Sequence, residues 1–173
     1  MSSIIVAGDT SGSVTLQAPA VSGSTVLTLP AQTGTVMVNG PAFSALMAAN
    51  QTITANVYTK VQFSSKEFDT NTNYDATTNY RFTPAVAGYY QVNASVYPST
   101  TVLSVEADIY KNGSMFKRGF STSTNGIGQV SVLVYMNGAT DYIECYTSIN
   151  GTTPTISNNN SLSWFQAFLA RSA

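Results

Sequence analysis

The chain has 173 residues, of which 43% are hydrophobic and only 9% are charged, and its formal net charge is −1. This composition excludes a disordered chain, and it offers no basic surface to nucleic acid or to acidic lipid. Histidine is absent and Cys145 is the single cysteine. No Ser-His-Asp or Cys-His arrangement, intrachain disulfide or multi-cysteine zinc site can form, so we expect a protein that is not an enzyme and binds no cofactor.

The residues after Met1 do not predict a targeting or membrane segment. The apolar run Ile4 to Ala7 is too short for a signal-peptide core and far too short for a membrane span. We therefore expect neither a membrane nor a nucleic acid among the partners.

Residues 1–40 predict a β-rich arm. Asp9 is the only charged residue before Lys60. An approximate repeat aligns residues 11–19 with residues 22–30, each beginning Ser-Gly-Ser and ending in Pro, and residues 35–38 add a third strand-like piece. Strands this few cannot bury their apolar sides within one chain, so the arm must dock on a partner or wrap around one axis with the arms of other copies. The predicted contact residues are Val14, Leu16, Val26, Leu27, Leu29, Val36 and Val38.

Residues 8–40 also carry a resemblance. The segments SGSVTLQAP and STVLTLPAQTGTVMVNG resemble a stretch common in bacteriophage virion proteins, in tail fibres and head-decorating proteins alike. The resemblance implies a structural protein on the outer surface of a phage particle, made in the host cytoplasm. A generic β arm with turn residues is the alternative interpretation.

Residues 41–173, called the knob below, predict an all-β sandwich or jelly roll. Apolar residues alternate along residues 88–98, 102–111, 129–136 and 141–149, and Asn-Gly dipeptides supply the positive φ of tight turns. The predicted core faces are Tyr90, Val92, Ala94 and Val96, then Leu103, Val105, Ala107 and Ile109, then Val130, Val132, Val134 and Met136, and last Ile143, Cys145 and Ile149.

The opposite faces of these strands carry tyrosine where a monomer would place charges or small polar groups. An apolar ring with a polar tip suits a wet subunit interface, although scattered surface tyrosines are the simpler interpretation. The predicted interface residues are Tyr89, Tyr97, Leu133, Tyr135, Tyr142 and Tyr146.

From about Phe43 to Leu169 the order of motifs resembles the globular head of complement q and its tumour-necrosis-factor-like relatives. The matching segments are residues 61–63, the run YRFTPAVAGYY at 80–90, IYKNG at 109–113, the strand-turn-strand at 133–142, and FQAFL at 165–169, in which Ala stands where the family has Gly. The resemblance implies a ten-strand jelly roll that forms a homotrimer around a three-fold axis. It does not imply what the trimer binds.

Three further groups of polar residues are candidates for a site. Glu67, Asp69 and Asp75 supply oxygen ligands of the kind calcium takes, or simply form a solvated loop, which we favour. Glu106 and Asp108 share one strand face, as a glycosidase pair could, but we expect them to keep an exposed sheet soluble by pairing with nearby cations. The polar loops 121–128 and 150–161 are candidate tips for binding a host-surface glycan, through Asn125, Asn150, Asn158 and Asn159.

Three functions follow from the sequence. The chain is a capsid decoration or cement protein that contacts the major capsid protein through its arm, or a tail or head fibre adhesin attached to a tail or baseplate protein, or a small depolymerase. The depolymerase is the weakest, because no catalytic group is organised. Fibres usually have a long repetitive shaft, and the short arm therefore favours the decoration protein.

Overall fold

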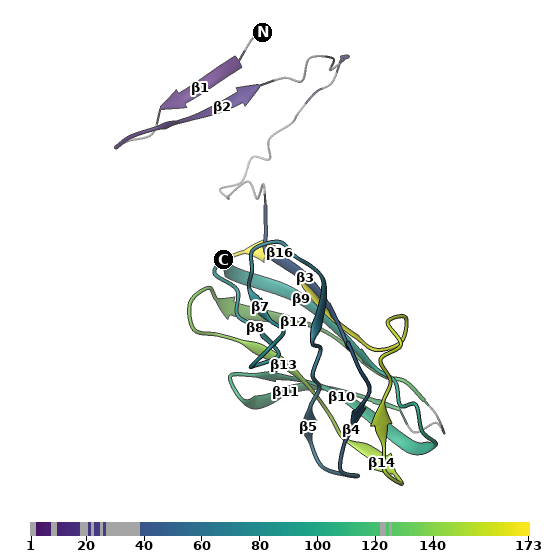
Figure 1. Ribbon diagram of the computed structural model, residues 1–173. Coiled ribbons are helices and arrows are strands. Elements are labelled where there is room, and N and C mark those ends of the chain that lie inside the picture. The colour runs from purple at the N-terminus through teal and green to yellow at the C-terminus, as the bar shows by residue number, and fades with distance from the viewer. Residues whose placement is uncertain are drawn as a thin grey trace. The chain divides into compact units, whose positions relative to one another are not determined.

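The computed structural model describes residues 3–7, 10–17, 21, 23–24, 26, 39–121, 124 and 126–173, and it contains only β-strands, turns and loops over these residues (Figure 1). The chain divides into two units, Met1–Gly34 and Thr35–Ala173. The first unit holds one hairpin, in which β1 (Ser3–Ala7) pairs antiparallel with β2 (Ser13–Gln17). The sequence does not predict the strand β1, because a run as short as Ile4 to Ala7 lies outside the repeat that indicates the other strands of the arm.

The second unit contains two antiparallel sheets stacked as a sandwich, which confirms the predicted all-β jelly roll. The five-stranded sheet has the order β12 (Gly128–Asn137), β9 (Ala87–Val96), β16 (Trp164–Ser172), β3 (Ala42–Leu46) and β6 (Ser65–Asp69). The seven-stranded sheet has the order β11 (Ser114–Ser121), β10 (Val102–Lys111), β13 (Ile143–Thr147), β8 (Arg81–Phe82) and β7 (Tyr74–Asp75), while β14 (Ile149–Gly151) pairs with β10 and β5 (Thr59–Lys60) with β13. A small sheet joins β4 (Gln51–Thr52) to β15 (Thr155–Ile156).

The core lies between the two large sheets, and its aromatic centre is Phe43. The Phe43 ring stacks on Tyr74 and on Phe82 with centroids 4.6 Å apart in both cases, and it meets Phe165 edge-on at 5.0 Å. The buried hydrophobic residues run from Phe43 to Leu169, so the knob has a core of its own. Offset and edge-on ring pairs add specific geometry to this apolar burial.

The four predicted core faces are confirmed except at one residue, Leu103 of β10. The alternating residues of β9, β12 and β13 that were expected inside are buried. On β10, Val102 is 1% exposed whereas Leu103 is 62% exposed. The register of β10 against β14 slips between Val102 and Ser104, and such a bulge interrupts the alternation of side chains. Leu103 therefore points away from the core, whereas Val105, Ala107 and Ile109 are buried as predicted.

Two glycines meet backbone requirements of the sandwich, Gly113 through its positive φ and Gly119 through a close approach of two strands. Asn112 and Gly113 take φ values of 52° and 78° in the turn between β10 and β11, as their sequence predicts. A Cβ on Gly119 would lie 1.6 Å from the backbone oxygen of Gln129. Gly119 therefore lets β11, an edge strand of the seven-stranded sheet, pack directly against β12, an edge strand of the five-stranded sheet.

Candidate functional site

The outward face of the five-stranded sheet, called the five-strand face below, is largely uncharged. The strands β3, β9 and β12 contain no charged residue. Because side chains alternate along a strand, burial of one set in the core leaves the other set pointing away from it. Phe68 (51%) is exposed on the edge strand β6. Four large side chains of the outward set on β9, β12 and β16 are also exposed: Tyr89 (41%), Leu133 (54%), Tyr135 (44%) and Phe168 (49%).

These four side chains lie in two adjacent rows across the sheet. Tyr89 and Tyr135 are directly opposite each other on β9 and β12, and their ring centroids are 5.5 Å apart. In the next row, Leu133 and Phe168 both lie opposite Gln91, from β12 and β16. The rows form one apolar patch spanning three strands, and patches of this kind on a soluble protein mark interaction surfaces.

A band of polar side chains borders the patch, and its members already bond to one another. Ser131 Oγ donates to Asn93 Oδ1 at 2.8 Å, and Gln91 Nε2 donates to Ser131 Oγ at 3.0 Å. In the same row of opposite residues, on the neighbouring strands β16 and β3, Gln166 Nε2 donates to Ser44 Oγ at 3.2 Å. Ser44 Oγ in turn donates to Glu67 Oε2 at 2.6 Å. Polar groups with partners inside the chain lose little when another molecule covers them.

The outward face of the seven-stranded sheet, called the seven-strand face below, has a different chemistry. Arg118 Nε lies 3.1 Å from Asp108 Oδ1, and Arg118 Nη2 lies 3.2 Å from Glu106 Oε2. Asp108 is fully buried beneath these neighbours, and its desolvation raises the pKa of its carboxyl against the opposing effect of Arg118. Both carboxylates thus serve one structural ion-pair cluster rather than a hydrolytic pair. The expectation that they keep an exposed sheet soluble is wrong for Asp108, because that side chain does not reach solvent.

Tyrosines complete the seven-strand face. The Tyr110 and Tyr146 rings stack with centroids 4.1 Å apart, and the Arg81 guanidinium lies 4.3 Å from the centre of the Tyr142 ring. Burial is the largest cause of the raised pKa of Tyr110 and of Tyr146. Rings and charges on this face are therefore engaged with one another within the chain.

The structure divides the six predicted interface residues between different surfaces. Tyr89, Leu133 and Tyr135 lie together on the five-strand face, whereas Tyr146 belongs to β13 of the other sheet and Tyr142 directly precedes that strand. Tyr97 follows β9 and is half-buried. The single tyrosine face inferred from the sequence is wrong, because alternation reveals which residues share a face of one strand but not which sheet that strand joins. Phe168 is not among the predicted interface residues, although it lies between the buried residues Ala167 and Leu169 and alternation alone would place it on the outward face.

No protein-family model matches the sequence, and no curated protein matches it significantly. Solved structures do match the fold. Murine APRIL superposes with a TM-score of 0.60 at 9% identity, over 76% of this chain and 99% of that one. The Eiger TNF of S. frugiperda gives 0.54 at 8% identity, over 78% and 93%. PRD1 vertex protein P5 gives 0.53 at 16% identity, over 75% and 92%.

The knob is a tumour-necrosis-factor-like jelly roll. Identities this low show the fold alone, so the resemblance inferred from the sequence is confirmed for architecture and goes no further.

The arm residues that the structure describes are exposed. Val14 and Leu16 lie on β2 and are 65% and 55% exposed, and Val26 is 90% exposed. Leu27, Leu29, Val36 and Val38 lie outside the described residues. On β1, Ile4 and Val6 are also exposed and had no place in the predicted docking set.

The predicted tip residues fall in three different places. Asn158 and Asn159 are exposed in the loop after β15, where Asn159 Oδ1 accepts a hydrogen bond from Ser161 N at 3.0 Å. Asn125 lies outside the described residues. Asn150 is not in a loop: it belongs to β14 and pairs with Ser104 of β10. Its neighbour Gly151 allows close approach rather than a turn, because a Cβ there would lie 2.9 Å from Val102 Cγ1.

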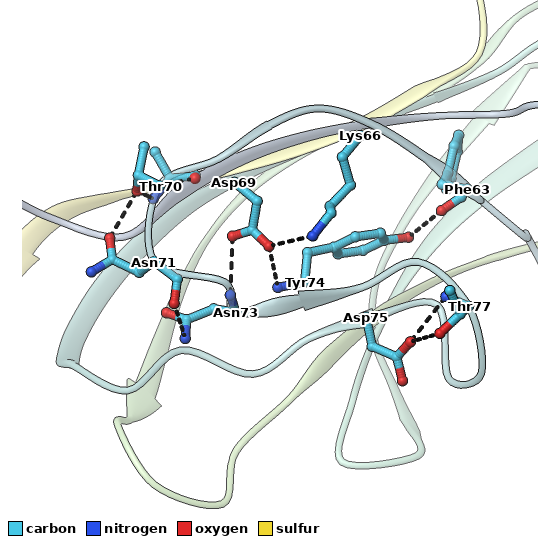
Figure 2. A network of polar contacts seen from close by, with 10 residues as sticks. Phe63, Lys66, Asp69, Thr70, Asn71, Asn73, Tyr74, Asp75 and Thr77 are labelled. Carbon is cyan, nitrogen blue, oxygen red and sulfur yellow. Dashed lines mark hydrogen bonds and ion pairs between the residues drawn. The ribbon is translucent and has the colours of Figure 1, made fainter.

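The polar loop around Asp69 and Asp75 is a set of turns held by carboxylates (Figure 2). Asp69 accepts hydrogen bonds from the backbone N–H groups of Asn73 (3.0 Å) and Tyr74 (3.1 Å) and pairs with Lys66 at 3.2 Å. Asp75 accepts from the backbone of Thr77, Thr78 and Asn79, and these bonds hold its pKa far below the usual range. The carboxylates therefore act as turn caps, which supports the interpretation of a loop over that of a calcium site. Over the described residues, no three His, Cys, Asp or Glu side chains gather as metal ligands would, and no helix is long and apolar enough to cross a membrane.

Proposed function

We propose that this chain is a non-enzymatic structural protein of a phage particle: a homotrimer that decorates or cements the capsid and docks on the head through its N-terminal arm. The observation that carries the proposal is the presence of two separate apolar surfaces on one short chain. One is the patch of the five-strand face, and the other is the hairpin of the arm, which exposes apolar side chains on both of its faces, Ile5 on one and Ile4, Val6, Val14 and Leu16 on the other. A trimeric decoration protein needs such a pair, one surface for its own copies and one for the shell.

Self-association is assigned to the five-strand face. It exposes rings and a leucine beside polar groups that already have partners, and its central strands add no charge that association would have to desolvate. Tyr142 and Tyr146, on the seven-strand face, are left outside this interface. The tumour-necrosis-factor-like fold is compatible with a three-fold arrangement, and a fold neighbour that is a vertex protein of the phage PRD1 supports a place on a virion.

The arm is assigned to the capsid. A trimer presents three arms at once, so each can bind the major capsid protein weakly while the assembly binds strongly by avidity. Chains lacking residues 1–40 should remain folded, because the buried core runs from Phe43 to Leu169. These truncated chains should sediment as trimers and fail to decorate purified capsids that the full chain covers. Decoration by the truncated chain would disprove docking through the arm.

A fibre adhesin is the second candidate, and the exposed loop with Asn158 and Asn159 favours it. Gold-labelled antibody on particles separates the two functions. Label spread over the heads supports decoration, whereas label confined to the tail or its tip supports an adhesin. The double variant Asn158→Ala and Asn159→Ala should leave capsid binding unchanged in the first case and reduce binding to host cells in the second.

A further inference from the structure

The hairpin of β1 and β2 has two chemically different faces. Residues directly opposite each other in an antiparallel pair lie on the same face, and the register pairs Ile4 with Leu16 and Val6 with Val14. These four aliphatic side chains, 66%, 55%, 56% and 65% exposed, form what we call the aliphatic face of the arm. The intervening pairs occupy the other face, where Ile5 lies opposite Thr15 and Ala7 opposite Ser13.

A two-stranded hairpin with an open aliphatic face is not stable alone. Isolated hairpins are marginal in water, and a third element is needed to cover the apolar side. The face is also too small to hold free molecules together, since four side chains offer far less than the roughly 800 Å² per partner of a stable interface. Its occupant must therefore be held nearby by some other contact.

We infer that the aliphatic face packs against the same face of the other two copies, so that the three arms form a small apolar core on the trimer axis. This inference rests on the proposed trimer, and it specifies which face of the arm is used within it. The arm leads directly into β3, which is part of the five-stranded sheet. The entry point is fixed there, because Leu169 N donates to Pro41 O at 3.0 Å and a Cβ on Gly40 would lie 2.9 Å from Leu169 Cβ.

The chain thus enters the knob at the sheet whose outward face meets the other copies, so all three arms begin beside the common axis. Segments tethered within one assembly meet at effective concentrations on the order of millimolar, which compensates for a small contact area. A capsid surface offers no such tether before docking. The opposite face, with Ile5 and Thr15, is then the one left for the shell.

Cysteine cross-linking in the full chain tests the inference. Val14→Cys places a thiol on the aliphatic face, and Thr15→Cys places one on the next residue, which is also exposed but faces the other way. The native Cys145 is fully buried and its burial raises the pKa of its thiol, so the introduced thiols report alone. Both variants are oxidised at micromolar concentration and run on a non-reducing gel, and the same samples are sedimented.

We expect both variants to sediment as trimers, with Val14→Cys forming covalent dimers at least ~10-fold faster than Thr15→Cys, because its thiols meet within the assembly. Trimers in which the two variants cross-link at equal rates, or not at all, would overturn the inference while leaving the trimer intact. Monomers in sedimentation would overturn the proposed trimer and this inference together.

Discussion

The most direct perturbation of the proposed interface is Leu133→Lys. Leu133 belongs to the five-strand patch on the edge strand β12 and is 54% exposed in the single chain, so the chain loses little stability when it is replaced. In a trimer the exposed half of each leucine is buried, which contributes about 1 kcal/mol per copy or about 3 kcal/mol for the assembly. The lysine ammonium would add a desolvation cost on a face whose central strands are uncharged.

These magnitudes predict a trimer weakened more than ~100-fold, since each 1.4 kcal/mol is tenfold in an equilibrium constant. Leu103→Lys is the matched control, because Leu103 is 62% exposed and lies on β10 of the other sheet. Sedimentation across a concentration series measures assembly, and urea unfolding monitored by circular dichroism checks the fold. A Leu133→Lys protein that assembles like the wild type, or a Leu103→Lys protein that dissociates equally, would refute the assignment of the face.

Three further predictions concern the chain itself. Arg118→Met leaves the Asp108 carboxylate buried without its cation and should lower the free energy of unfolding by about 3 kcal/mol at pH 7. The pKa of the Asp108 carboxyl is higher in the folded state than its value of 3.8 in the unfolded chain. The loss of stability should therefore shrink as the pH falls toward 4 and the carboxyl becomes protonated. A loss that stays constant with pH would contradict the reasoning. Asp75→Asn should lower the free energy of unfolding, measured in urea at pH 7, by about 1 kcal/mol. The difference should narrow below pH 3.8, because the hydrogen bonds that lower the pKa of Asp75 stabilise only its ionised form. Cys145 should resist a thiol reagent in the native protein and react in urea, and rapid native labelling would show that β13 opens.

Much of the knob could be predicted from alternation alone. The segment 102–111 has the bounds of β10, and segments 88–98 and 129–136 correspond to β9 and β12 within two residues at each end. These strands are long, with apolar residues at every second position, so a shift of one residue would expose the whole core face. Leu103 was misplaced because a bulge is one extra residue that leaves no mark in the alternating pattern.

The functional surface was harder to predict, because it depends on how strands are assigned to sheets. Tyr135 and Tyr146 look alike in sequence, each alternating with buried residues, yet they belong to opposite sheets. Asn150-Gly151 resembles the turn at Asn112-Gly113, but pairing with β10 holds it extended. Long-range pairing decides both cases, and local sequence carries little information about it.

The contrast between the two outward faces is the physical reason for proposing the five-strand face as the interface. Covering the seven-strand face would take the charges of Lys60, Arg81 and Arg118 out of contact with water. This desolvation costs several kcal/mol per ion unless a partner supplies matching charges. A second copy brings the same charges in the same arrangement, and its ion pairs are already formed internally. The patch on β9, β12 and β16 has a smaller cost, because Ser131, Asn93 and Gln91 keep their hydrogen bonds while the rings and Leu133 leave water. The charged Lys66 and Glu67 lie on β6, at the other edge of the sheet. Desolvation therefore favours the proposed association through this patch, independently of any likeness to other proteins.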